Sequence, residues 1–308
     1  MPPLVSIIVP SFNQGRFIRA TLESVLGQDY RPLEILVIDG ASTDETVSVL
    51  KSFSNHKELT WVSESDSGVV EAVNKGLARA GGLYAGIQSS DDVYLPGAIR
   101  HGVQELQGTE APGFVFGDIE KIDAEGQTLS RSHLEEFSIE NVLSMKTWIP
   151  QPSTFFRLDL AKRLGGWRDL APYAADTDLW YRMMFEAPAK KIDALWAQRR
   201  HHDEQRDVHG DRIIRDYGRM LDNNEALANG PSRYRRAAKA GRLLMANRYS
   251  RSQDDYWTAY VRILRATVIW PELLQRNPLP SLIPGFYPLR NALARLLKRR
   301  KSGTQLSS

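Results

Sequence analysis

The first half of the chain alternates short strand-like runs with helix-like segments, and this alternation limits the possible folds more than any other feature. Val5 to Val9, Leu33 to Ile38 and Leu83 to Ile87 are apolar runs of strand length. Arg16 to Leu26 and Val69 to Ala80 instead carry apolar residues at helical spacing. Strands that are apolar on both faces and joined by helices form a mainly parallel sheet. The sequence therefore predicts an α/β fold, with a Rossmann-like sheet flanked by helices.

Weaker signals fill the rest of this region. Ser42 and Glu45 have the spacing of a capping box, which predicts that a helix begins there. Leu59 to Val62 resembles a strand. Beyond Pro96, Phe114 to Phe116 predicts a short strand and Ile119 to Leu129 predicts a hairpin. We therefore expect antiparallel additions to the parallel sheet.

The last third of the chain has a different character. From Asp211 the strand signals vanish, and Arg-rich helical stretches run to Trp270. A Pro-broken linker follows, and then a last predicted helix from Leu289 to Lys298. We place a domain boundary near residue 208, so that residues 1–208 form the α/β domain and residues 209–308 form a helical extension.

Charge divides at the same boundary. Residues 1–208 carry 21 Lys or Arg and 30 Asp or Glu (21 − 30 = −9), whereas residues 209–308 carry 19 and 7 (19 − 7 = +12). An acidic front part suits a divalent metal and a polar substrate, and a basic extension suits an acidic partner such as nucleic acid, an anionic membrane or acidic sugars.

Several classes of site are excluded because the chain has no cysteine. It can hold no disulfide, thiolate zinc site, iron–sulfur cluster or cysteine nucleophile, and a reducing compartment fits. The first residues lack the basic region of a secretory signal. The longest apolar candidate, Trp257 to Trp270, is interrupted by Arg262 and is shorter than the roughly 18 to 20 residues of a membrane span. We expect a cytoplasmic protein that does not span a membrane.

Acidic residues follow three predicted strands in succession: Asp39 comes after the second strand, Asp66 after the third, and Asp91 and Asp92 after the fourth. Asp and Ser after a strand are also ordinary helix caps and turn formers, so any one of them is weak evidence of a site. In open α/β sheets, however, ligands bind beyond the carboxyl ends of the strands. Carboxylates that converge there repel one another, and a bound divalent cation is the simplest compensation.

At this point the chain resembles the inverting family 2 glycosyltransferases, which have the GT-A nucleotide-sugar-binding fold. The resemblance spans about two-thirds of the sequence and is specific in the order and combination of its motifs. The motifs are Val5 to Asn13, Thr21 to Gln28, Val37 to Asp44, Asp66-Ser67-Gly68, Asn74-Lys75-Gly76 and Ser89 to Asp92.

The resemblance implies a donor site. Asp39 matches the carboxylate that accepts a hydrogen bond from a pyrimidine imide, and Asp91 matches the residue that contacts the ribose. Arg200 and His202 fit a short Arg-x-His segment that closes over the diphosphate. The predicted donor-binding residues are Pro10, Ser11, Phe12, Asn13, Asp39, Asp66, Lys75, Ser90, Asp91 and Arg200.

The same resemblance implies a metal, Mn²⁺ or Mg²⁺, with Asp92 and His202 as its ligands. Ser90 stands where a strict Asp-x-Asp element has its first carboxylate, which leaves fewer protein ligands. The cation would then depend on diphosphate oxygens and water, as these ions do with nucleotides.

Asp176 matches the family's catalytic base, which follows an acceptor loop at Gly165-Gly166-Trp167. Asp176 and Asp178 at a helix start would also stabilise the helix dipole without any catalytic role. With the resemblance, we assign Asp176 as the base. Gln151 and Trp167 are the predicted acceptor contacts, although aromatic residues also serve as core.

The leading interpretation is an inverting, metal-dependent glycosyltransferase of the hexosyltransferase type. It would move a sugar from a nucleotide-diphosphate donor, by preference a UDP-sugar, to a glycan or lipid-linked acceptor in cell-surface polysaccharide synthesis, and it would not bind nucleic acid. The alternative is a non-catalytic GT-A-like module that binds nucleotide sugar or glycan, which Ser90 and Thr177 permit. A nucleotidyltransferase ranks below both, because Gln14-Gly15-Arg16 is too short a phosphate loop.

The basic extension suggests peripheral contact with the inner face of a membrane. In the predicted last helix, Leu289 to Lys298, leucines form a stripe beside Arg and Lys residues. Such a stripe equally fits packing on the catalytic domain or on a second subunit. The sequence leaves both readings open.

Overall fold

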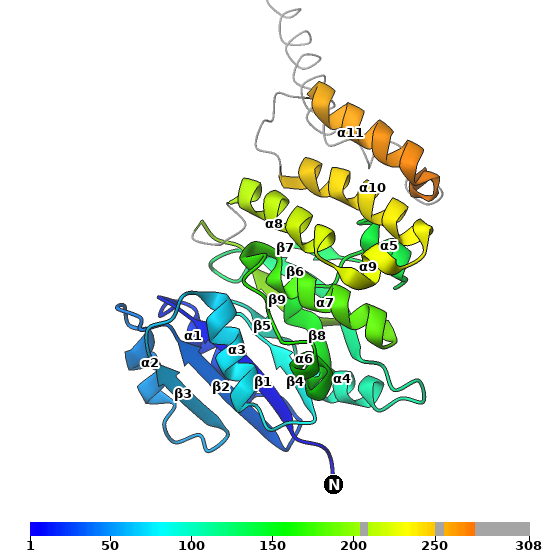
Figure 1. Ribbon diagram of the computed structural model, residues 1–308. Helices are drawn as coiled ribbons and strands as arrows, with labels where there is room; N and C mark the ends of the chain where they lie inside the picture. The colour runs from blue at the N-terminus through cyan, green and yellow to red at the C-terminus, as the bar shows by residue number, and fades with distance from the viewer. Residues whose placement is uncertain (204–208, 250–255, 275–308) are drawn as a thin grey trace, which may run out of the picture.

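The computed structural model describes residues 1–203, 209–249 and 256–274. Its centre is a nine-stranded sheet with the order β3-β2-β1-β4-β8-β6-β9-β5, in which β7 pairs with β6 off this path (Figure 1). The strands are β1 (Val5–Ser11), β2 (Leu33–Asp39), β3 (Leu59–Ser63), β4 (Tyr84–Ile87), β5 (Val93–Tyr94), β6 (Phe114–Ile122), β7 (Thr128–Ser132), β8 (Thr154–Arg157) and β9 (Ala189–Arg200).

The N-terminal half of the sheet is parallel, as the alternation predicts. β1 pairs in parallel with β2 and β4, and β2 pairs in parallel with β3. The connections are α1 (Ile18–Leu26), α2 (Thr46–Ser52) and α3 (Val69–Arg79), close to the predicted bounds. The α/β fold class is confirmed.

The predicted antiparallel additions are also present. β8 lies between β4 and β6 and is antiparallel to both, and β6 forms the predicted hairpin with β7. β6 runs far beyond its predicted three residues because it also pairs with β9, in parallel, along most of its length. The short β5 closes the far edge against β9. The sheet as a whole is therefore mixed.

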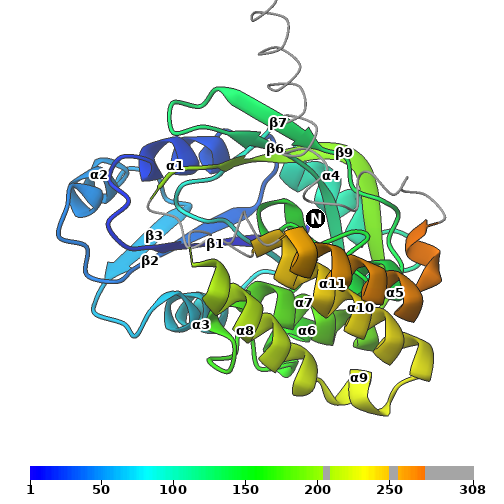
Figure 2. The ribbon, with the colours of Figure 1, turned by 90° about the horizontal axis from the view of Figure 1, so that it is seen from above.

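Helices cover both faces of the sheet and bury its alternating side chains in two cores. Ile8 faces α3 and α7 (Ala175–Glu186), whereas Ile7 faces α1 and α4 (Ala98–Leu106) (Figure 2). Because neighbouring strand residues point to opposite faces, each predicted strand supplies both cores. The shorter helices are α5 (Ile139–Leu143), η1 (Gln151–Ser153), α6 (Leu158–Arg163) and η2 (Pro172–Ala174).

The predicted helical extension forms a stack above the carboxyl ends of the parallel strands. Its helices are α8 (Gly210–Asp222), α9 (Glu225–Asn229), α10 (Ser232–Tyr249), α11 (Tyr256–Ile269) and η4 (Pro271–Leu274), with α11 outermost (Figure 1). Tyr217 of α8 and Ala237 of α10 lie in the same hydrophobic cluster as Trp180 of α7. The boundary near residue 208 stays a prediction, and the predicted helix from Leu289 to Lys298 lies outside the described residues. None of the described helices combines the length and apolar character needed to cross a bilayer.

The predicted capping box at Ser42 is wrong. The helix begins three residues later than that box requires, with Glu45 at its N-cap, and Asp44 accepts from the Thr46 amide at 2.9 Å just before the helix. Ser42 instead donates its hydroxyl to Asp39 at 2.5 Å, because the buried Asp39 carboxylate needs donors. Asp44 also accepts from the Gly15 amide at 2.9 Å, which fixes the turn after β1 against α2.

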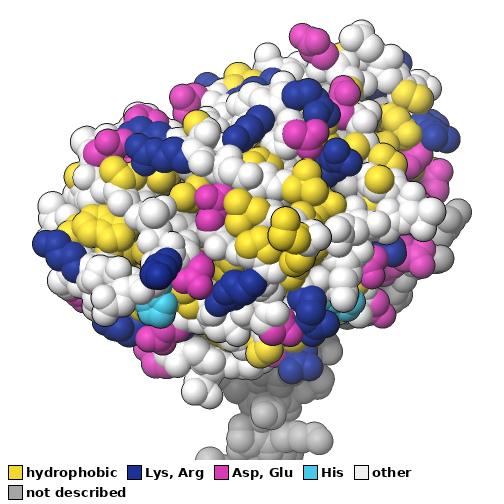
Figure 3. All heavy atoms as spheres, turned by 90° about the horizontal axis from the view of Figure 1, so that it is seen from below, with side chains coloured by type: hydrophobic (Ala, Val, Ile, Leu, Met, Phe, Trp, Pro, Cys, Tyr) yellow, Lys and Arg dark blue, Asp and Glu magenta, His cyan; other side chains and the backbone are white. Residues whose placement is uncertain are grey.

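The amino-terminal end of the sheet forms the face seen in Figure 3, opposite the helical stack. Lys, Arg, Asp and Glu side chains are interspersed on this face, and hydrophobic side chains lie near its middle. No single charge dominates it.

Candidate active site

A cavity of about 910 Å³ lies at the carboxyl ends of the parallel strands. Residues that follow β1, β3 and β4 line one side of it. The other side comes from the segment after α5, from η2 and α7, and from α8 and α10. Of the predicted donor residues, those that line the cavity are Pro10, Ser11, Phe12, Asp66, Ser90 and Asp91.

Phe12 and Asp66 stand at the mouth of the donor side. Phe12 is 59% exposed, which is unusual for a phenylalanine directly after a buried strand. Asp66 accepts from the Gly68 amide at 2.9 Å, in the turn that leads into α3. An exposed aromatic ring beside a carboxylate and turn amides can hold a planar base and polar groups attached to it.

Asp39 is fully buried beneath this region and is not part of the cavity lining. Its carboxylate accepts from the Ser42 amide at 3.0 Å and from the Ser63 hydroxyl at 2.6 Å, in addition to Ser42 Oγ. The neighbouring Gly40 does line the cavity. Asn13 likewise lies beside it rather than in it, and its side chain accepts from the Thr43 amide at 2.9 Å.

The Ser90-Asp91-Asp92 element lies in the cavity wall with His202. Asp91 Oδ2 lies 3.1 Å from His202 Nε2, and Asp92 Oδ1 accepts from the Arg200 amide at 2.8 Å. Burial, followed by the neighbouring Asp91 carboxylate, raises the pKa of Asp92 well above its usual value, and the Arg199 cation opposes this rise. The two carboxylates therefore share this part of the cavity wall with His202 and Arg199.

Arg199, rather than the predicted Arg200, lines the cavity. The Arg200 guanidinium donates instead to the carbonyl groups of Asp91, Asp123 and Ala124, at 2.9 to 3.1 Å. Side chains of neighbouring residues in a strand point to opposite faces. An error of one residue in matching the Arg-x-His segment therefore selects Arg200 in place of Arg199.

Lys75 also differs from the prediction. Its ammonium group lies 3.0 Å from Glu64 and 2.9 Å from Glu71, on the exposed side of α3, and it does not line the cavity. The hydrogen bond from Lys75 is the largest cause that lowers the pKa of Glu71 to about 2. In this structure Lys75 stabilises α3.

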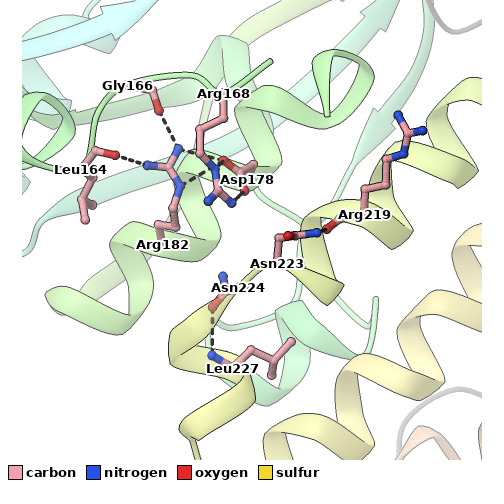
Figure 4. A network of polar contacts seen from close by, with 9 residues as sticks. All are labelled: Leu164, Gly166, Arg168, Asp178, Arg182, Arg219, Asn223, Asn224 and Leu227. Atoms are coloured by element: carbon pink, nitrogen blue, oxygen red, sulfur yellow. Dashed lines mark hydrogen bonds and ion pairs between the residues drawn. The ribbon is translucent and has the colours of Figure 1, made fainter. Parts of the chain in front are cut away.

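Asp176 and Asp178 have opposite environments although they stand two residues apart on α7. Asp176 is half-buried and lines the cavity, and Thr177 Oγ1 donates to it at 3.3 Å. Asp178 is fully buried and is bound by the guanidinium groups of Arg168 and Arg182 (Figure 4). Asp178 is therefore taken up by its two arginine partners away from the cavity, whereas Asp176 faces the cavity.

The same network fixes the predicted acceptor loop. Arg182 donates to the carbonyl groups of Leu164 and Gly166 (Figure 4). From α3, the Asn74 side chain donates to the Trp167 carbonyl at 2.8 Å and accepts from the Trp167 amide at 2.9 Å. The loop is therefore held from both sides, and this places the Trp167 indole in the cavity wall.

Gln151, the other predicted acceptor contact, lines the cavity from η1. Its amide group already has protein partners: it accepts from Ser89 Oγ at 3.0 Å and donates to the Ile87 carbonyl. Two other buried groups in the wall, Trp167 Nε1 and Trp180 Nε1, make no hydrogen bond with any described residue.

Sequence reasoning missed the contribution of the helical stack. Ile213 and Tyr217 of α8 and Met245 and Arg248 of α10 line the cavity beside α7. The Arg248 guanidinium lies 5.4 Å from the Trp148 ring centre, which links α10 to the segment after α5. No local motif marks these residues, because only the packing of α8 and α10 brings them to the cavity.

One other group of metal-ligating side chains occurs among the described residues, formed by Asp118 of β6, His133 directly after β7 and Asp193 of β9. It lies outside the cavity lining. The Lys191 ammonium group already lies 3.0 Å from Asp193 and 3.5 Å from Asp118 and supplies the compensating charge.

The sequence profile described as "Glycosyl transferase family 2" matches residues 6–165, which span all the strand ends on the donor side. The chain belongs to glycosyltransferase family 2. Among its relatives, an uncharacterized glycosyltransferase of Rickettsia felis is 28% identical over 212 residues, which cover 66% of this chain and 35% of that protein. The chondroitin synthase of Escherichia coli is 27% identical over 211 residues, which cover 67% and 30%. The aligned part thus spans about a third of each of these relatives.

Solved structures of similar fold cover nearly the whole chain. Residues 1–349 of TarS from S. aureus, in complex with UDP-GlcNAc, align with a TM-score of 0.64 and 16% identity, covering 93% of this chain and 87% of that one. The mannosyltransferase PcManGT from Pyrobaculum calidifontis, in complex with GDP-Man and Mn²⁺, aligns with a TM-score of 0.61 and 20% identity, covering 100% and 89%. At these identities the likeness is one of fold, and the fold is GT-A.

Proposed function

We propose that this protein is an inverting, metal-dependent glycosyltransferase that transfers a sugar from a UDP-sugar to a hydroxyl group of a glycan or lipid-linked acceptor. The observation that carries the proposal is the single cavity wall that joins Ser90-Asp91-Asp92 to Asp176. A donor-side carboxylate pair and an acceptor-side base in one cavity are the two parts that sugar transfer needs. The nucleotide-sugar complexes of TarS and PcManGT support a donor of this class.

Asp176 would act as general base. It would accept the proton of the acceptor hydroxyl as that oxygen attacks the anomeric carbon of the donor, and the bond to the diphosphate would break on the opposite face. One displacement inverts the anomeric configuration. Arg199 and His202 lie on the donor side of the same wall and would stabilise the negative charge of the departing diphosphate.

Asp92 and His202 would hold Mn²⁺ or Mg²⁺, with Asp91 beside them. The geometry supports this, because the buried Asp92 stands in the cavity wall with Asp91 and His202, and Asp91 Oδ2 already lies 3.1 Å from His202 Nε2. Bound there, the cation supplies charge neutralisation to the diphosphate. His202 would have to exchange its contact with Asp91 for the metal.

The acceptor would lie on the side of the cavity that α7 and the helical stack line together. The two indole N–H groups without a described partner, on Trp167 and Trp180, can donate to acceptor hydroxyl groups. The Gln151 side chain would hold η1 in place through its hydrogen bonds with Ile87 and Ser89. Cell-surface polysaccharide synthesis at the inner face of a membrane is the setting we propose for this acceptor class.

Calorimetry of UDP binding with and without Mn²⁺, followed by measurement of UDP release from a panel of UDP-sugars without acceptor, tests the proposal. We expect Mn²⁺-dependent binding and slow release. Asp92→Asn should abolish the Mn²⁺ dependence, because it removes the carboxylate placed on the cation. Asp193→Asn, in the cluster that Lys191 neutralises, is the matched control and should behave as the wild type.

Three results would contradict parts of the proposal. Equal affinity in the wild type and Asp92→Asn would remove the metal site, and loss of Mn²⁺ dependence in Asp193→Asn alone would move it to β9. Binding without release from any UDP-sugar, and without transfer to any acceptor, would favour the non-catalytic binding module.

A further inference from the structure

The outermost helix of the stack, α11, is apolar on two opposite faces. Its inner face buries Ile263 and Ala266, and Trp270 continues this face beyond the helix end. The side that points away from these residues is exposed and carries Trp257 (72% exposed), Tyr260 (40%), Leu264 (42%) and Val268 (80%). We call these four residues the outer stripe.

The outer stripe is regular rather than scattered. Its members follow one another at intervals of three, four and four residues, which places them on one side of an α-helix. The Trp257 and Tyr260 rings lie 5.9 Å apart between centres. Half of the large hydrophobic side chains that are exposed in the described residues belong to this one helix. A helix that is apolar on both sides is normally covered on both sides.

The charge around the stripe restricts what can cover it. Helix α10 carries six Lys or Arg and α11 carries two, and neither helix contains Asp or Glu. Arg233 and Arg242 are paired with Glu140 and Asp222. Arg235, Lys239 and Arg265 are exposed and form no ion pair within the described part of the chain.

Two possible binding partners of the outer stripe carry the same positive charge as the helices around it, and charge repulsion argues against both. A second copy of the chain, docked by the same face, would bring two arginine-rich helices together. Residues 275–308, which follow η4, carry seven Lys or Arg and no Asp or Glu, so this segment has the same sign of charge as the helices. An anionic surface with an apolar interior satisfies both the charge and the stripe. Trp and Tyr are also the side chains enriched where a bilayer meets water.

We propose that the outer stripe of α11 docks on an anionic lipid bilayer, with the exposed Arg265 of the same helix at the headgroups. This inference rests on the proposed function, because docking on a bilayer would bring the enzyme to a lipid-linked acceptor. The helical stack also connects the outer stripe with the cavity, since α11 packs on α10 and α10 supplies Met245 and Arg248 to the cavity lining. The membrane contact predicted for the helix at Leu289 to Lys298 lies outside the described residues and stays a prediction, and α11 provides a second element for the same contact.

Co-sedimentation of the full chain with vesicles tests this, using phosphatidylcholine alone and phosphatidylcholine mixed with phosphatidylglycerol. We expect binding to the mixed vesicles only, weakened by salt. Val268→Glu combined with Leu264→Glu should lower the bound fraction at least about tenfold, since each places a carboxylate in an apolar and anionic interface. Leu129→Glu, at an exposed leucine on β7 (54% exposed), is the matched control and should leave binding unchanged. Thermal unfolding checks that all variants fold.

Binding that the double variant does not reduce, or equal binding to both kinds of vesicle, would overturn the proposal. Sedimentation velocity tests for self-association. If the wild type is a dimer and the double variant is a monomer, the outer stripe is a contact between two copies of the chain. Donor binding and UDP release are measured on the same samples. If they persist without vesicle binding, only this inference fails and the proposed function stands.

Discussion

Asp176 and Asp178 illustrate how two carboxylates in one helical turn come to have different roles. The α7 turn carries Asp176 toward the cavity and Asp178 inward, onto two arginines. We expect Asp176→Asn to lower the transfer rate by roughly 10² to 10⁴ and to leave donor affinity nearly unchanged, because only a general base is lost. Steady-state transfer assays and UDP calorimetry measure the two quantities.

Asp169→Asn is the control for this prediction, because Asp169 is an exposed carboxylate close to the same loop. It should keep full activity. If Asp176→Asn retained the wild-type transfer rate, another residue would be the base and our assignment would be wrong.

For Asp178 we expect loss of stability. Asp178→Asn removes the negative partner of Arg168 and Arg182, whose side chains are only 32% and 12% exposed. Breaking a buried ion pair from one side costs about 3 to 5 kcal/mol of unfolding free energy, and we expect the lower end because Arg168 reaches water. Denaturant unfolding measures this cost. An unchanged midpoint would mean that the network adds little to stability.

For individual residues, the sequence predicts the cavity lining where a motif follows directly after a strand. It fails where the direction of a side chain depends on how two strands pair. Ser90, Asp91 and Asp92 line the cavity as expected, because the carboxyl end of β4 leaves them no other place. Arg199 and Arg200 are indistinguishable by sequence. Which of them faces the cavity depends on how β9 pairs with β6 and β5, and that pairing is made by residues about 80 to 100 positions away.

At the scale of elements, α10 passes unusually close to α5. A Cβ atom at Gly241 would lie 2.0 Å from the Leu143 carbonyl oxygen, a backbone atom that cannot give way. We expect Gly241→Ala to push the helices apart and to cost about 1 to 3 kcal/mol of unfolding free energy. Transfer should weaken more than donor binding, because Met245 lies one turn further along α10 in the acceptor wall.

Gly81→Ala provides the comparison, since a Cβ there would meet its nearest atom at an ordinary 3.7 Å. Thermal unfolding together with separate donor and acceptor titrations distinguishes the variants. Equal stability of both variants would show that α10 and α5 adjust without strain. The strands of the parallel half could be predicted because their pattern is local, whereas the approach of α10 to α5 joins residues about 100 positions apart and leaves no periodic signal.

At the scale of the whole molecule, the change in composition near residue 208 and the packing of the chain give different divisions. The charge and the strand signals change there, which predicts two domains. Yet Tyr217 of α8 is fully buried, and its hydroxyl lies 3.1 Å from that of Tyr181, which in turn donates to the Val142 carbonyl at 3.0 Å. The composition marks where the architecture changes from sheet to helices, and the core continues across that point.

We therefore expect the full chain to unfold in one calorimetric transition that includes the helical stack. A fragment of residues 1–208 should unfold at a lower temperature and bind hydrophobic dyes, because the removal of α8 and α10 uncovers the apolar side of α7 and α5 around Tyr181 and Val142. The fragment should also lose acceptor-dependent transfer before it loses UDP binding, since the donor side of the cavity comes from residues before 208 and α8 and α10 contribute to the lining beside α7. Two separate transitions in the full chain, with a fragment as stable as the first of them, would instead establish residue 208 as a true folding boundary.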